Sequence, residues 1–94
     1  MTTGTLQRTE PTTGGVDTGD PWRVILYNDN WHTFDEVVLQ VRKAARCSRE
    51  EALAITYRAH TTGRAVAYAG SKPDCQRALG VLREIALQAE LDEA

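Results

Sequence analysis

The sequence contains only two cysteines, Cys47 and Cys75, too few for a disulfide framework and without the spacing of a metal site. Both lie among apolar positions, so we expect two buried thiols. No apolar stretch is long enough for a signal-peptide core or a membrane span. The net charge of −2 and the lack of a basic run disfavour nucleic acid as a partner. We therefore expect a cytoplasmic protein that binds neither nucleic acid nor membranes. We also expect it to be a monomer.

Large apolar residues are also scarce in the first twenty positions, which hold seven Thr and four Gly but only Met1, Leu6 and Val16 as large apolar side chains. A segment of this composition cannot bury enough surface to offset the entropy lost on ordering. We predict a disordered N-terminal arm over residues 1–20 and one folded domain over residues 21–94.

The folded part begins with a β-branched and aromatic run over residues 22–27, which predicts a strand that ends at the turn residues 28–30. Thr33 and Glu36 have the spacing of a capping box, and apolar residues then recur at helical intervals. A helix is therefore predicted from Phe34 to about Arg46.

Four more elements are predicted from cap, turn and alternation signals. They are a helix capped by Ser48 and ended by Gly63, a strand over residues 64–69 with a turn at Gly70, a helix that begins at residues 71–74, and a short strand over residues 87–91. The order βααβαβ predicts an α+β fold, a small α/β sandwich of three helices on a three-stranded antiparallel sheet.

The polar residues Asn28, Asp29 and Asn30 stand where the first strand ends, and His60 falls near the end of a predicted helix. Asn and Asp are common in turns because their side chains hydrogen-bond to their own backbone. A His near the C-terminal end of a helix interacts favourably with the helix dipole. The alternative is a cluster of acceptors for an ammonium group. A metal site of Asp29, His32 and His60 matches no ligand motif. Both of the first two interpretations stay open on these residues alone.

Catalytic chemistry has little support, because no Ser or Cys lies in a nucleophile motif. The aromatic residues Trp31 and Phe34 beside the turn are either core residues or a hydrophobic rim. An exposed Trp after a polar turn indicates a binding surface.

The string from Val24 to Asn30, followed by a helix near Phe34, resembles the ClpS family of protease adaptors. The segment Ala59-His60-x-x-Gly63-Arg64-Ala65 resembles that family's Val-His-x-x-Gly-Lys-Ala segment. This chain and the family align without a gap from Trp22 to about Cys75. The resemblance implies a non-catalytic adaptor without a cofactor. Such adaptors bind proteins that begin with a large hydrophobic residue, the bacterial N-degron, and deliver them to the N-domain of a Clp-type AAA+ unfoldase.

The resemblance also implies which residues form the site. The family positions that bind the substrate's α-amino group correspond to Asn28, Asn30 and His60, with Asp29 beside them. The side chain of the substrate's first residue fits a pocket. The walls of this pocket correspond to Leu26, Tyr27, His32, Phe34, Val37, Thr56, Ala59 and Leu87. Family members usually carry Asp, Thr, Met and Val where this chain has Asn30, His32, Thr56 and Ala59. A second interpretation is a protein-interaction module on the same fold that does not read N-termini.

Overall fold

The computed structural model describes residues 22–93, so the predicted arm over residues 1–20 lies outside the described residues. The elements follow the predicted order: β1 (Trp22–Tyr27), α1 (Phe34–Ala45), α2 (Arg49–Thr62), β2 (Arg64–Gly70), α3 (Lys72–Arg83) and β3 (Ala89–Glu93). The predicted fold class is therefore confirmed.

The last strand begins at Ala89 and not at Leu87, which differs from the prediction. Ala86 has a left-handed φ of 62°, and the Leu87 amide donates to the Leu82 carbonyl at 3.3 Å. Leu87 therefore still belongs to the turn that ends α3, although its apolar character fits the alternation of a strand. Gly70, predicted as a turn, is the last residue of β2.

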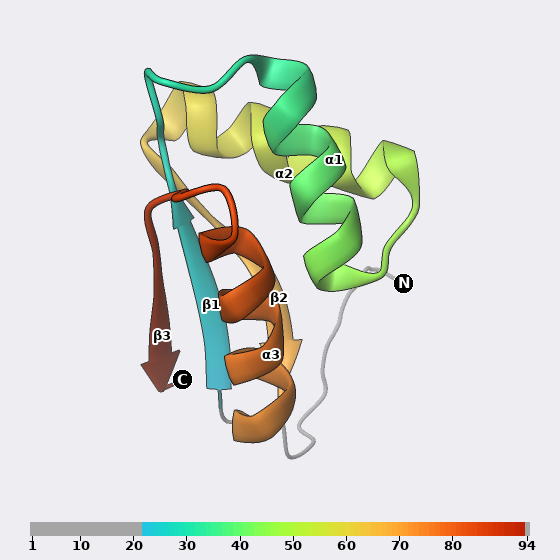
Figure 1. Cartoon of the computed structure of the whole chain (residues 1–94), viewed down its shortest axis with the longest axis vertical. Helices are drawn as coiled ribbons and strands as arrows, with labels where there is room; N and C mark the ends of the chain where they lie inside the picture. Colours follow the sequence, from blue (N-terminus) through green and yellow to red (C-terminus); the bar gives the residue numbers. More distant parts are fainter. Residues whose placement is uncertain (1–21, 94) are drawn as a thin grey trace.

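The sheet has the order β2-β1-β3, and both pairings with the central strand are antiparallel (Figure 1). Val24 and Leu26 of β1 are fully buried, whereas Arg23, Ile25 and Tyr27 on the opposite face are only partly buried. Because all three helices contact the strands, the buried face of the sheet is the one that they cover.

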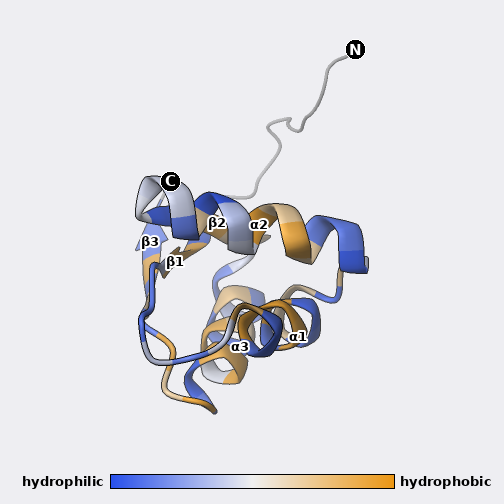
Figure 2. Cartoon of the chain, turned by 90° about the horizontal axis from the view of Figure 1, so that it is seen from above, coloured by the Kyte–Doolittle hydropathy of each residue, from blue (hydrophilic) through white to orange (hydrophobic). Residues whose placement is uncertain are grey.

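The hydrophobic core lies between this face and the helices, where the apolar residues of α1 and α3 come together (Figure 2). Cys75 is fully buried, as predicted, but Cys47 is only partly buried because it lies in the exposed connection between α1 and α2. Burial nevertheless raises the pKa of the Cys47 thiol. None of the helices within residues 22–93 is long and apolar enough to cross a membrane.

The predicted caps fix where the two helices beside the first turn begin and end. Thr33 and Glu36 form a complete capping box, with the Thr33 amide donating to Glu36 Oε1 at 2.8 Å and the Glu36 amide to Thr33 Oγ1 at 3.1 Å. Gly63 ends α2 with a φ of 97°, a conformation that favours glycine. Helix α1 therefore begins a few residues after β1, and α2 ends beside the end of β1.

The end of β1 is hydrogen-bonded on both sides. The Tyr27 amide donates to the Gln88 carbonyl at 3.0 Å, and the Asn28 amide donates to the Gly63 carbonyl at 2.9 Å. The second bond places Asn28 directly beside the end of α2, which carries His60.

Candidate functional site

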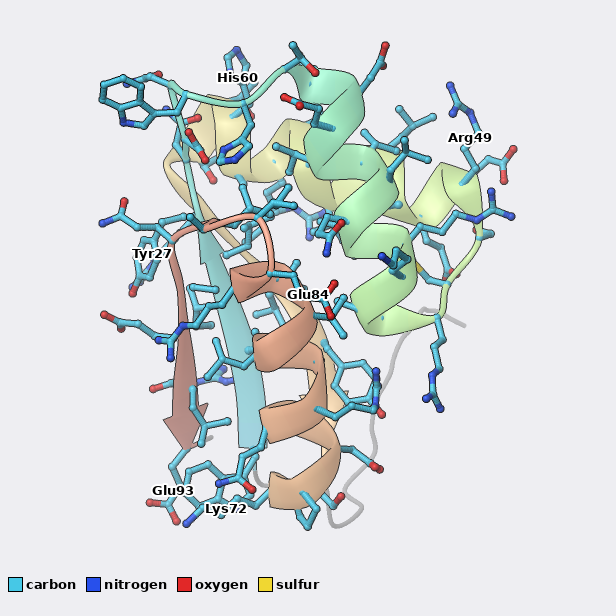
Figure 3. The ribbon with its side chains drawn as sticks, viewed as in Figure 1. Tyr27, Arg49, His60, Lys72, Glu84 and Glu93 are labelled. Atoms are coloured by element: carbon cyan, nitrogen blue, oxygen red, sulfur yellow. The ribbon has the colours of Figure 1, made fainter. Side chains whose placement is uncertain are left out.

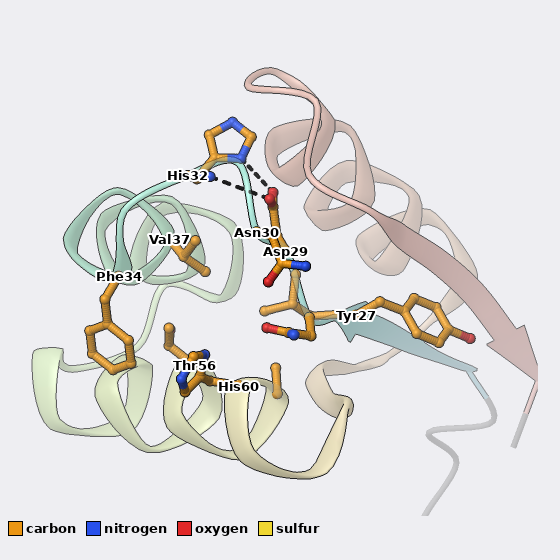
Figure 4. A pocket seen from close by; sticks show the side chains of 11 residues that line it. Tyr27, Asp29, Asn30, His32, Phe34, Val37, Thr56 and His60 are labelled. Atoms are coloured by element: carbon orange, nitrogen blue, oxygen red, sulfur yellow. Dashed lines mark hydrogen bonds and ion pairs between the residues drawn. The ribbon is translucent and has the colours of Figure 1, made fainter.

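A pocket of about 310 Å³ lies between the end of β1, the start of α1 and the last turns of α2 (Figure 4). Its size is within the range of small-ligand sites. The residues that line it come from two segments far apart in the sequence: Leu26, Tyr27, Asn28, Asp29, Asn30, His32, Phe34, Val37, Thr56, Ala59 and His60. Every residue predicted for the site is in this set except Leu87.

Leu87 and Tyr27 are placed differently from the other predicted wall residues. Leu87 is buried in the core and lines a separate hollow with Arg83 and Gln88. The Tyr27 ring points away from the pocket (Figure 4), and its hydroxyl donates to Glu90 Oε1 at 3.0 Å. Tyr27 therefore contributes its ring to the outer face of the sheet and not to the pocket wall.

Three polar side chains at the pocket keep their acceptors open. Asn28, Asn30 and His60 make no side-chain hydrogen bond to any residue in the described range 22–93. Asn28 is partly buried, and Asn30 and His60 are exposed. His60 lies at the end of the molecule where β1 leads into α1 (Figure 3). The amide oxygens of the two Asn side chains and a ring nitrogen of His60 are thus potential hydrogen-bond acceptors among the residues that line the pocket.

Asp29, in contrast, is engaged within the turn. Its Oδ1 accepts hydrogen bonds from the amides of Trp31 and His32, the latter at 3.3 Å, and its Oδ2 is bonded to His32 Nδ1. Only 8% of the Asp29 side chain and 19% of the His32 side chain are exposed. The carboxylate therefore holds both the backbone of the turn and the imidazole that lines the pocket (Figure 4).

The pair shifts the ionisation of both groups. Burial opposes ionisation of Asp29, but hydrogen bonds from the Trp31 amide and from His32 outweigh it and hold the pKa of Asp29 below its ordinary value. The hydrogen bond to Asp29 raises the pKa of His32, against the opposing effect of burial. A positive charge on His32 and a negative charge on Asp29 thus favour each other beside the pocket.

A pH dependence of stability follows from the raised pKa of His32. The stabilisation by the pair should be fully present below the ordinary His pKa of about 6.5 and lost as the pH rises through the raised value. We expect the difference in unfolding free energy between the natural chain and His32→Ala to be larger at about pH 6 than at about pH 9 in urea titrations. His60→Ala is the matched control. An equal difference at both pH values for His32→Ala would contradict the ion pair.

Buried side chains form the apolar bottom of the pocket. Val37 and Ala59 are 8% and 3% exposed. The Thr56 hydroxyl donates to the Ala52 carbonyl at 2.8 Å, so its proton is used within α2. Phe34 is 40% exposed and meets His60 edge to face, with ring centroids 6.5 Å apart. The pocket therefore has an apolar floor and a rim formed by two rings.

No cluster of three or more His, Cys, Asp or Glu side chains that could hold a metal ion occurs within residues 22–93. Sequence reasoning grouped Asp29 and His32 only as candidate metal ligands and missed the ion pair between them. Their spacing of three residues in a turn was the available signal.

The fold and this pocket together define a small α+β binding domain. The sequence matches the family described as "ATP-dependent Clp protease adaptor protein ClpS" over residues 17–91, and the chain belongs to this family of adaptors. The family resemblance carried by the Asn-Asp and His-x-x-Gly segments is thereby confirmed.

Two eukaryotic ubiquitin ligases contain a related segment. E3 ubiquitin-protein ligase UBR1 of Drosophila melanogaster is 34% identical over 64 residues, and human UBR2 is 28% identical over 67 residues. These regions cover 68% and 71% of this chain but only 4% of each ligase. The chain thus corresponds to a small part of these much longer proteins.

A solved structure has the same fold. Agrobacterium tumefaciens ClpS2 bound to L-phenylalaninamide matches with a TM-score of 0.70, covering 82% of this chain and all of that one. The two sequences are 18% identical, so this likeness establishes the fold alone.

Proposed function

We propose that this protein binds other proteins through a free N-terminal amine and a bulky hydrophobic first side chain, and delivers them to a Clp-type AAA+ unfoldase. The observation that carries the proposal is the pocket itself. It joins the open acceptors of Asn28, Asn30 and His60 to an apolar floor within a single hollow of about 310 Å³.

A free α-amino group is an ammonium with three N–H donors, so it requires three acceptors in a fixed array. The oxygens of Asn28 and Asn30 and a ring nitrogen of His60 supply that number. Asp29 also lines the pocket, where its negative charge is shared between His32 and the ligand, while its own hydrogen bonds hold the turn. An acetylated N-terminus lacks the charge and two of the donors, and would leave the acceptors unpaired.

The first side chain would lie on the apolar floor. Complete burial of a Phe or Leu side chain supplies about 1.5–3 kcal/mol. The ClpS2 structure supports this pairing of groups, because the L-phenylalaninamide bound to that protein has a free amine next to a benzyl side chain.

The test uses labelled peptides that differ only at the N-terminus. Fluorescence anisotropy should show binding of a peptide that begins with Phe, much weaker binding when the same peptide is acetylated, and weak binding when it begins with Gly or Glu. Equal binding of the free and acetylated peptides would instead favour the interaction module that does not read N-termini.

The width of the pocket leads to a further expected result. Thr56 and Ala59 stand where the family usually has Met and Val, so we expect this pocket to admit Trp and β-branched first residues. Filling it by Thr56→Met with Ala59→Val should lower affinity for Trp-initiated peptides about tenfold relative to Leu-initiated ones. An unchanged ranking of peptides in a folded double variant would show that these positions do not set the width.

Delivery to an unfoldase is supported by membership of a family of Clp protease adaptors. The direct test is degradation of a reporter protein with an N-terminal Phe by a Clp unfoldase and its protease, with and without the full chain. Acceleration that disappears with His60→Ala would support delivery. Peptide binding without acceleration by any Clp unfoldase would leave recognition intact and contradict the second half of the proposal.

A further inference from the structure

Trp31 is the most exposed large hydrophobic side chain among residues 22–93, with 93% of its surface open to solvent. It stands between Asn30 and His32, which both line the pocket, but it is not a lining residue itself. The Trp31 backbone is therefore next to the pocket in the chain, and its indole is open to solvent and does not line the pocket.

The backbone beneath this indole is held in place. The Trp31 amide donates to Asp29 Oδ1, the same oxygen accepts from the His32 amide, and Thr33 begins the capping box of α1 two residues later. An exposed aromatic ring on a fixed turn loses little backbone freedom when it is covered, which is the property of an anchor in a binding surface.

We propose that Trp31 forms a second subsite, which binds an apolar side chain at the second residue of the substrate. This inference rests on the proposed function, because the first residue must already occupy the pocket. Consecutive Cα atoms are about 3.8 Å apart, so the second residue of the substrate lies close to the mouth of a pocket that holds the first. Trp31 lies in the chain between two residues that line the pocket, Asn30 and His32, so a substrate that occupies the pocket is the ligand nearest to its exposed ring.

The subsite selects apolar side chains because the surface of the Trp31 indole is large and mostly apolar. Its ring N–H is its only hydrogen-bond donor. A second residue such as Leu would remove apolar area of both partners from water, whereas Gly would cover little of it. The protein would then read two residues of the N-terminus, the first by a closed pocket and the second by an open surface.

The test compares peptides that begin with Phe and carry Gly, Ala, Leu, Glu or Arg as the second residue. In the natural chain we expect the Leu peptide to bind about three- to tenfold more tightly than the Gly peptide. In Trp31→Ala this ratio should fall to about one, while the Phe-Gly peptide still binds. Tyr57→Ala is the matched control, since Tyr57 is also an exposed aromatic residue, at 62%, and does not line the pocket.

Tryptophan fluorescence gives a second, direct measurement. The sequence has two Trp residues, so Trp22→Phe leaves Trp31 as the sole tryptophan, which is excited selectively above the tyrosine absorption. The Phe-Leu peptide should shift its emission to shorter wavelength more than the Phe-Gly peptide does. An unchanged Leu-to-Gly ratio in Trp31→Ala, or a preference for Arg or Glu over Leu, would overturn the subsite. Failure of the proposed function is distinguishable, because then no Phe-initiated peptide would bind better than its acetylated form.

Discussion

Replacing Asn28 or His60 by alanine is expected to weaken binding of a Phe-initiated peptide by about tenfold to a hundredfold. Each change removes one acceptor from the ammonium and leaves one of its donors unpaired in a partly enclosed site, which costs about 1–3 kcal/mol. Neither side chain has another hydrogen-bond partner within residues 22–93, so the loss should appear in binding and not in stability. Anisotropy titrations and urea unfolding of the same variants measure the two effects separately.

Arg58→Ala is a suitable control for these variants, because Arg58 is exposed on the same last turns of α2 but does not line the pocket. It should bind the peptide as the natural chain does. If Asn28→Ala and His60→Ala both remain folded and also bind normally, the amine site is not where we propose.

The second large effect is expected for Asp29→Ala, and it should appear in both stability and binding. The substitution removes an acceptor used by two backbone amides and by the His32 ring, all of which hold the turn between β1 and α1. Since hydrogen bonds to a charged group are worth about 1.5–3 kcal/mol, we expect the unfolding free energy to fall by about 2–3 kcal/mol. Peptide affinity should fall as well, because the turn carries Asn30.

Asp29→Asn separates the charge from the geometry. The amide oxygen can still accept from the Trp31 and His32 amides, but the negative charge beside the ammonium is gone. This variant should keep most of the stability and still lose affinity for the peptide. A chain that tolerates Asp29→Ala without loss of stability would show that the capping box at Thr33 holds the turn alone.

The features that the sequence predicts well are those set by neighbouring residues. Thr33 and Ser48 are N-caps because their hydroxyls reach amides three residues away, and Gly63 ends α2 because glycine adopts positive φ without strain. The pocket required more, since nothing local brings Asn28 next to His60. The family resemblance paired those two segments, and the fold supplies the reason in the bond from Asn28 to Gly63.

The differences between prediction and structure also have physical reasons. The outward direction of Tyr27 was available from strand alternation, because Leu26 points inward and successive side chains of a strand point to opposite faces. The position of Leu87 was not available, because a left-handed Ala86 prolongs the turn after α3 and alanine gives no signal for that conformation. Cys47 is only partly buried because it follows the end of α1, and the residue types around it do not distinguish it from a buried cysteine.

The two hydrogen bonds at the end of β1 have a consequence for how the site comes into existence. They join Tyr27 and Asn28 to Gln88 and Gly63, residues that are distant in sequence. Contacts of this separation require the loops between the paired residues to close first, which costs chain entropy and makes them slow to form. A nascent or partly unfolded chain that lacks these two bonds would not have the proposed amine site assembled. Capture of a substrate would then be reserved for the fully folded molecule, and incomplete chains could not compete with it for N-termini.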